Sequence, residues 1–150
     1  MANPSTPRRG PEHEKLAVFV GHWHAEGTNY DIDGKTSPWV SDEHVEWLPG
    51  RFFVVQRWHA NPDAPFIGMG VIGYDAEAKR YFTHSFENHG FFRQYEMRVD
   101  GDIWTFTGPS ERARVEFADN GDTQKIHWEF KPDKKWLPLC DRVAKRVRQT

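Results

Sequence analysis

Short runs of alternating polar and apolar residues, each followed by turn residues, fill the chain from residue 22 onward. Such runs are typical of strands in antiparallel hairpins. The breaks between them carry turn chemistry, as in Pro49-Gly50 and Asn120-Gly121. No stretch between two runs is long enough for the helix that joins parallel strands. The pattern predicts about ten antiparallel strands, at residues 22–30, 38–48, 51–59, 66–74, 81–87, 91–99, 103–107, 112–118, 123–130 and 139–147.

Strands that follow one another in short hairpins favour an up-and-down meander. An open sheet of this size would leave two exposed edges, which invite aggregation, whereas closing the sheet removes them. A barrel of about ten strands is wider than its own side chains fill. We therefore predict an all-β fold, an antiparallel up-and-down β-barrel with a cavity inside it.

The motif Gly21-His22-Trp23 begins the first strand and indicates where the barrel is closed. A glycine lets the backbone pass close to its neighbours, and an indole is wide enough to plug one end. Before the motif, apolar residues at helical spacing predict a short helix over 12–20, which Gly21 ends. We expect residues 1–11 to form a flexible arm and residues 12–150 a single barrel domain.

Composition limits the partners of the chain. The apolar content is only 37% and the mean hydropathy −0.80, but aromatic residues make up 15%, and their wide side chains can fill a barrel. A net charge of −2 gives no electrostatic reason to bind nucleic acid or an anionic membrane. No apolar run approaches the ~20 residues of a membrane span, and the polar start lacks a signal-peptide core. We expect a cytoplasmic protein of bacterial type, which can also form a homodimer.

Strict alternation along each strand assigns one set of side chains to the interior, and polar residues in that set are the informative ones. Burying an unpartnered polar group costs about 1–3 kcal/mol, so these residues should pair with one another, with water or with a ligand. Glu43 and Arg93 can form an internal ion pair, which leaves His84 and Tyr95 to face the cavity. The predicted inner polar residues are Ser41, Glu43, Gln56, His84, Arg93 and Tyr95.

The same alternation predicts an apolar wall for the cavity. On the fourth strand it places Ile67, Met69 and Val71 inside. On the fifth strand a slip of one residue would replace His84 with Thr83 and Ser85, because successive side chains point to opposite faces. The predicted wall consists of Trp39, Trp58, Phe82, Phe86, Met97, Trp104 and Trp128.

Several motifs taken in order resemble a known family. They are Gly21-x-Trp23-x-x-Glu26-Gly27, Glu46-Trp47-Leu48-Pro49-Gly50, Gly73-Tyr74-Asp75, His84-Ser85-Phe86-Glu87-Asn88-His89-Gly90 and Trp104-Thr105-Phe106-Thr107-Gly108. Together they resemble the DUF1579-type proteins, small bacterial barrels of the calycin (lipocalin-like) kind. The resemblance implies a barrel with a pocket and no established reaction.

The opening Gly-x-Trp is also similar to that of nitrobindin, a ten-stranded haem-binding barrel. That family holds the haem iron through a histidine on its last strand. Here the last predicted strand has no histidine, and Cys140 lies close to the ligand position. A thiolate can bind haem iron, whereas a lone cysteine in an apolar segment is more often an inert core residue.

Two further patterns are interpreted as surface features. His22-x-His24-x-Glu26 has a spacing that can hold zinc, but an inward Trp23 turns both histidines to solvent, so we predict no metal site. The basic residues near the end of the chain predict a solvated face. They are Arg142, Lys145, Arg146 and Arg148.

These observations favour a protein that binds a small, largely apolar or aromatic molecule in the barrel, with no cofactor. The polar groups of Glu43, Gln56, His84, Arg93 and Tyr95 would orient its polar end. An alternative is a cofactor-free isomerase, cyclase or lyase, in which His84 moves a proton and Arg93 or Tyr95 stabilises an oxyanion. A third is an interaction module with a filled interior and an exposed apolar patch.

Overall fold

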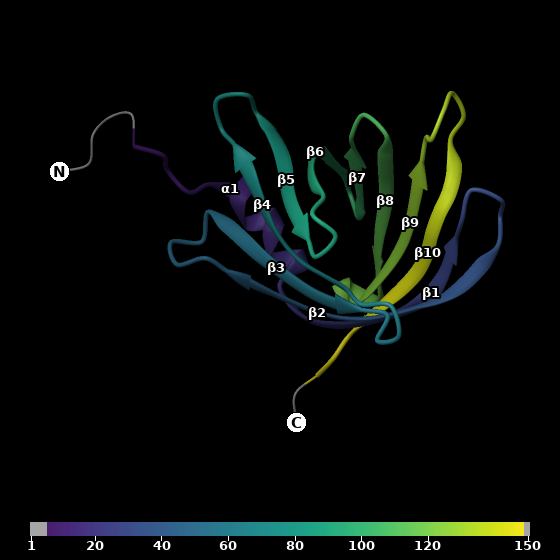
Figure 1. Ribbon diagram of the computed structural model, residues 1–150. Helices are drawn as coiled ribbons and strands as arrows, with labels where there is room; N and C mark the ends of the chain where they lie inside the picture. The colour runs from purple at the N-terminus through teal and green to yellow at the C-terminus, as the bar shows by residue number, and fades with distance from the viewer. Residues whose placement is uncertain (1–5, 149–150) are drawn as a thin grey trace.

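Ten strands close into one antiparallel barrel in this computed structural model, which describes residues 6–148 (Figure 1). Each strand pairs with its neighbours along the chain, and the last strand pairs with the first. This confirms the predicted all-β, up-and-down barrel. The strands are β1 (Gly21–Tyr30), β2 (Thr36–Trp47), β3 (Phe53–Ala60), β4 (Phe66–Asp75), β5 (Arg80–Glu87), β6 (Phe92–Asp100), β7 (Ile103–Thr107), β8 (Glu111–Ala118), β9 (Thr123–Phe130) and β10 (Leu137–Arg146).

The N-terminal helical segment is as long as the predicted helix, but it begins and ends one residue earlier and more than half of it is the tighter 3₁₀ helix. It consists of α1 (Pro11–Glu14) followed by the 3₁₀ helix η1 (Lys15–Phe19), and a second 3₁₀ turn, η2 (Asp119–Gly121), joins β8 to β9. Pro11 occupies the first helical position, where its missing N–H costs nothing. Val20 is already extended, so the helical segment ends at Phe19, one residue earlier than predicted. Part of the predicted arm, residues 1–5, lies outside the described residues.

Trp23 seals one end of the barrel, as its sequence context predicts. Its side chain is 1% exposed, and its Nε1–H donates a hydrogen bond to the carbonyl oxygen of Phe19, 2.9 Å away. The Arg146 guanidinium lies over the indole, 4.3 Å from the ring centroid. Arg146 also donates to the carbonyl oxygens of Val18 and Gly121, at 3.3 and 3.0 Å. Arg146, on the last strand, thus holds the helical segment against the sealed end of the barrel, which we call the floor. The prediction that Arg146 faces solvent is wrong.

Burial divides the inner face into two halves. Near the helical segment the inner side chains are almost fully buried, and Val54, Ile72, Met97 and Trp104 among them are at most 2% exposed. Towards the opposite end, inner side chains such as those of Trp58, Arg93 and Trp128 remain partly exposed to solvent. The barrel is therefore closed at the end where η1 lies and accessible at the other.

The inward faces predicted for β1 to β9 are correct except on β4 and β5. On β4 the inward positions include Gly68 and Ile72, while Ile67 and Met69 are 44% and 37% exposed. Trp58 explains the reversal, because a Cβ at Gly68 would lie 2.3 Å from an atom of its ring. Small residues face inward where a neighbour's large side chain already fills the space.

Candidate functional site

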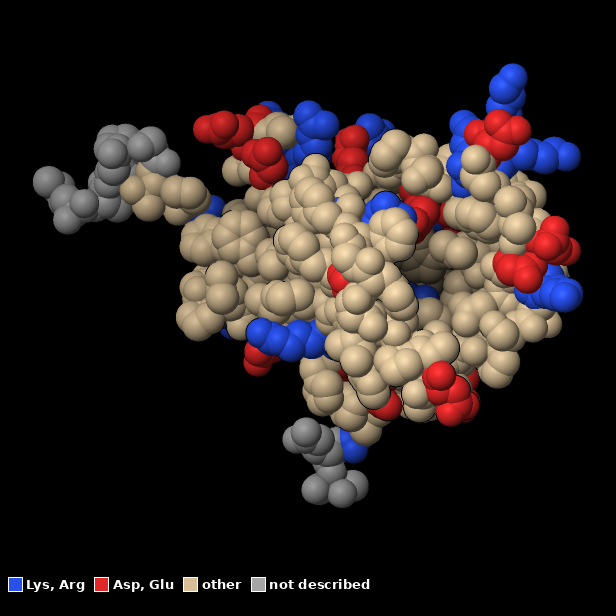
Figure 2. All heavy atoms as spheres, viewed as in Figure 1, with Lys and Arg blue, Asp and Glu red and all other residues tan. Residues whose placement is uncertain are grey.

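Polar and aromatic side chains from β2, β3, β6, β9 and β10 gather in the accessible half of the barrel. We call this group the lumen site; it consists of Trp39, Ser41, Glu43, Gln56, Trp58, Arg93, Tyr95, Trp128 and Arg142. Most of them remain partly exposed although they point into the barrel, so solvent enters the space between them. Figure 2 shows a hollow in this face of the molecule, with atoms of both basic and acidic residues visible in and beside it.

The first pair in the lumen site joins β2 to β3. Gln56 Nε2 donates a hydrogen bond to Glu43 Oε1, 2.6 Å away. Burial raises the pKa of the Glu43 carboxyl, against the opposing effects of the Gln56 hydrogen bond and the Arg142 charge. Glu43 therefore tends toward its neutral form inside the barrel.

A second network lies nearer the rim. Arg93 Nε donates to Glu111 Oε1 and the Tyr95 hydroxyl donates to Glu111 Oε2, both at 3.0 Å. The expected ion pair between Glu43 and Arg93 is thus absent: Glu43 pairs with Gln56, and Arg93 pairs with Glu111. Burial and the adjacent Glu111 carboxylate raise the pKa of Tyr95. Because its O–H proton is already donated to Glu111, Tyr95 is not a free donor for a developing oxyanion.

Arg142 belongs to the lumen site, although its position in a basic stretch predicted a solvated face. It pairs with Gly27 on β1, and on the other side of β1 Gly27 pairs with Trp39 on β2. A Cβ at Gly27 would lie 2.5 Å from the Arg142 Cα. Because Gly27 has no side chain, the guanidinium crosses β1 and lies 4.4 Å from the centroid of Trp39. Strict alternation along β10, which already places Cys140 inside, was the signal that could have identified Arg142.

The predicted wall residues separate into three groups. Trp39, Trp58 and Trp128 line the lumen site, where Trp128 packs against Tyr95 with ring centroids 5.3 Å apart. Met97 and Trp104 face inward as predicted but belong to the sealed half of the core. The remaining two, Phe82 and Phe86, are on the outer face.

His84 also lies on the outer face, so its predicted inward position is wrong. On β5 the inner residues are Tyr81, Thr83 and Ser85, and Thr83 is 3% exposed. The His84 ring packs instead against the outer aromatic residues Phe82 and Phe92. The proposed role of His84 as an acid or base in the cavity depended on the inward position and loses its basis.

The inner surface does not fit a haem held by a histidine or a thiolate. Every histidine on the described strands alternates onto the outer face; these are His22, His24, His44, His59, His84 and His127. Cys140 does face inward and is buried, but burial raises the pKa of its thiol. A raised pKa disfavours the thiolate, which is the form that binds iron.

The histidines of β1 and β2 form a polar cluster outside the barrel. The rings of His22 and His44 stack 4.0 Å apart, and His24 Nδ1 lies 3.2 Å from Asp42 Oδ1. Within residues 6–148 no group of three or more His, Cys, Asp or Glu side chains has a geometry that could hold a metal ion. Because Trp23 points into the barrel, its neighbours His22 and His24 lie on the outer face, as expected.

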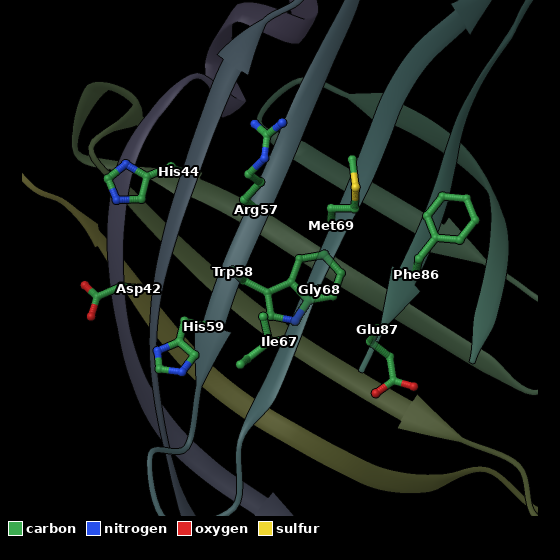
Figure 3. Close-up of a pocket in the computed structure, with 10 residues that line it drawn as sticks. All are labelled: Asp42, His44, Arg57, Trp58, His59, Ile67, Gly68, Met69, Phe86 and Glu87. Atoms are coloured by element: carbon green, nitrogen blue, oxygen red, sulfur yellow. The ribbon is translucent and has the colours of Figure 1, made fainter. Parts of the chain in front are cut away.

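A shallow groove of about 530 Å³ runs beside this cluster on the outer face of β2 to β5. Figure 3 shows Asp42, His44 and His59 along one side of it and Met69 and Phe86 on the other. The groove adjoins an outer apolar surface, which we define by Ile67, Met69, Phe82, Phe86 and Phe92.

Glu43 makes the stability of the protein dependent on pH. Its native pKa is raised, so its contribution to stability is present below the unfolded value of about 4.5 and is lost as the pH rises through the native pKa. Glu43→Gln is therefore expected to be more stable than the wild type at about pH 7.5 and equally stable at about pH 4. Each tenfold change in the acid dissociation constant of the carboxyl on folding corresponds to about 1.4 kcal/mol.

Urea unfolding at both pH values measures this difference. Glu46→Gln is the matched control, because Glu46 lies on the same strand with an exposed carboxylate on the outer face. Glu46→Gln should change the free energy of unfolding by less than about 0.5 kcal/mol at both pH values. A Glu43→Gln variant that is no more stable at the higher pH would show that the ionised carboxyl does not destabilise the folded protein.

Comparison with known proteins agrees with this architecture. The sequence model of a family described as a protein of unknown function, DUF1579, matches residues 8–132. The S-type phycobiliprotein lyase CPES from Guillardia theta has a similar fold, with 14% identity, a TM-score of 0.65, and coverage of 95% of this chain and 96% of that one. The structure of Rv2717c from M. tuberculosis is also similar, with 12% identity, a TM-score of 0.70, and coverage of 94% and 100%. No curated protein matches the chain. No helix within the described residues is long and apolar enough to cross a membrane.

Proposed function

The chain belongs to the DUF1579 family, and from that premise we propose that it binds a small molecule with an aromatic body in the lumen site. The observation that carries the proposal is the contrast between the two halves of the barrel. Side chains of the floor half pack to near-complete burial, whereas six of the nine residues of the lumen site stay partly exposed. A core that only stabilised the fold would gain by filling this space.

The chemistry of the lumen site supports the same proposal. Three indoles supply broad apolar surfaces, and a few polar groups between them can orient a ligand, which is the usual composition of a small-molecule pocket. The buried Nε1–H of Trp58 has no hydrogen-bond partner within the described residues. An unpaired buried donor costs about 1–3 kcal/mol, and an acceptor on the ligand would recover it.

Filling the lumen tests the proposal. Ser85→Phe places a large ring at an inward position of β5, and we expect it to abolish quenching of tryptophan fluorescence by aromatic probes such as 2-naphthol. The matched control is His84→Phe, one residue away on the outer face. The control should bind the probes as the wild type does. If the wild type binds none of a panel of apolar and aromatic probes, or if Ser85→Phe still binds them, the lumen is not the binding site.

The outer apolar surface supports a second proposal, association of two copies of the chain. Phe86 and Phe92 are 47% and 51% exposed, and their rings stack 5.2 Å apart. At about 4.8 Å per strand and 3.4 Å per residue, a surface that spans β4 to β6 over five residues covers roughly 250 Å². That is about a third of the ~800 Å² that each partner buries in a standard interface, and the side chains around it can supply the rest.

Light scattering after size-exclusion chromatography tests the association. The wild type should elute as a dimer, and Phe86→Glu should shift it to a monomer. Ile32→Glu is the control, because Ile32 is 62% exposed but lies in the turn between β1 and β2. A monomeric wild type at concentrations of about 100 µM would contradict the proposal, since a dimer with a Kd of about 10 µM or below is mostly associated at that concentration.

A further inference from the structure

Arg142 is a cation inside the barrel to which no acid is paired. Among residues 6–148, no carboxylate oxygen lies within 4.0 Å of its guanidinium. Its direct contacts are the face of Trp39, 4.4 Å away, and the thiol of Cys140, 3.7 Å from Nη1. We propose that Arg142 binds a carboxylate group of the ligand and so makes the lumen site selective for aromatic acids. The inference rests on the proposed binding in the lumen.

The other inner arginines show what a structural role looks like in this barrel. Arg93 pairs with Glu111 at 3.0 Å, and Arg146 pairs with Asp122 at 3.0 Å while donating to backbone carbonyl oxygens of the floor. Burying a charge is costly unless it is paired and hydrogen-bonded. Arg142 lacks such partners, so an anionic group that enters the barrel would gain an ion pair without displacing an existing one.

Gly27 leaves the space that the Arg142 side chain occupies on its way to Trp39. A Cβ at this position would lie 1.9 Å from the Asp141 carbonyl oxygen and 2.7 Å from the Arg142 Cβ. The absence of a side chain lets Arg142 cross β1 and stack on Trp39. Stacking on a ring restricts the guanidinium while leaving its N–H groups free, which prepares a planar fork for a carboxylate.

Neighbouring groups favour an anion in the same place. Ser41 Oγ accepts a hydrogen bond from Trp39 Nε1 at 2.9 Å, so its own O–H proton is available to donate. Glu43 is hydrogen-bonded to Gln56 and lies beyond ion-pair distance of Arg142. A carboxylate on Arg142 would have the indoles of Trp39 and Trp58 beside its apolar body, and this arrangement favours an acid with one or two aromatic rings.

A pair of probes that differ only in charge tests the inference on the unmodified protein. Titration calorimetry would compare 2-naphthoate with 2-naphthamide, which have the same ring and nearly the same size. We expect 2-naphthoate to bind at least about tenfold more tightly. If both probes bind with equal affinity, the carboxylate inference is wrong and lumen binding stands. If neither binds, and the wider panel fails as well, the proposed function itself is wrong.

Variants then identify the arginine. Arg142→Met should reduce the affinity for 2-naphthoate at least about tenfold and leave that for 2-naphthamide within about threefold, because only the charge–charge contact is lost. Arg98→Met is the control: Arg98 is on the outer surface, with its side chain 82% exposed, and its removal changes the net charge equally. Unchanged preference for the acid in Arg142→Met would overturn the assignment.

Two further measurements keep the inference testable if Arg142→Met does not fold. Arg142→Lys retains the charge but not the planar fork, and it should bind 2-naphthoate with intermediate affinity. Added salt should weaken the binding of 2-naphthoate to the wild type and leave 2-naphthamide unaffected, since salt screens only the charged pair. A preference for the acid that persists in Arg142→Lys at full strength and does not respond to salt would contradict an ion pair at Arg142.

Discussion

Replacing Trp23 with alanine is expected to lower the free energy of unfolding by about 3–5 kcal/mol, the usual cost of removing a buried indole. The side chain is 1% exposed and anchors the floor through Phe19 and Arg146. Its loss opens a cavity and removes the donor for the Phe19 carbonyl oxygen. Since small domains are stable by only about 5–15 kcal/mol, this variant should unfold at much lower urea concentrations.

Trp136→Ala is the matched control for that experiment. Trp136 is partly exposed in the turn before β10 and contacts the cations of Arg112 and Lys131. Its removal should cost no more than about 1 kcal/mol. Urea unfolding followed by far-ultraviolet circular dichroism measures both variants. Equal losses for Trp23→Ala and Trp136→Ala would contradict the role of Trp23 as the plug of the barrel.

Gly27→Ala is expected to have an effect of similar size for the opposite reason, because it adds an atom where none fits. The new Cβ would lie 1.9 Å from the Asp141 carbonyl oxygen, and backbone rather than a flexible side chain would have to move. Overpacking typically costs about 1–3 kcal/mol, and a backbone clash in the seam between β1 and β10 should reach about 3 kcal/mol. The same shift should displace Arg142 from Trp39.

Gly10→Ala serves as the control for the glycine substitution. The nearest atom to a Cβ there is a Glu12 carboxylate oxygen at 3.6 Å, an ordinary contact. Its unfolding free energy should change by less than about 1 kcal/mol. The contrary result is a Gly27→Ala variant that unfolds at the same urea concentration as the wild type and keeps its preference for 2-naphthoate. That result would show that the backbone between β1 and β10 accommodates the added Cβ.

On β4 and β5 the prediction of the inward face failed because of one assumption. The more apolar set of each strand was assigned to the interior, which holds for a strand with a solvated outer face. On β4 and β5 the outer face is itself apolar, with Met69 and Phe86 paired across it, so composition pointed the wrong way. Gly68 faces inward because the ring of Trp58, from another strand, occupies the space beside it.

In the candidate site, the local sequence predicts which side chains face inward but not which residues they contact. Glu43, Gln56, Arg93 and Tyr95 face inward as alternation predicts. The partner of Arg93 and Tyr95 was not predictable, because their hydrogen bonds to Glu111 join β6 to β8, which are not neighbours in the sheet. Arg142 was missed because a basic stretch near a chain end is usually solvated, and nothing local indicates that Gly27 leaves room for it.

The sequence by itself determined the ten strands, their hairpin order and the plug at Trp23, because period-two alternation, turn residues and a glycine beside a tryptophan act over a few residues. Only the tertiary structure decided which face of β4 and β5 is buried, which charges are paired, and that Arg142 stands unpaired inside the barrel. These features depend on side chains that meet across the closed sheet, and closure brings together residues as distant as Gly27 and Arg142.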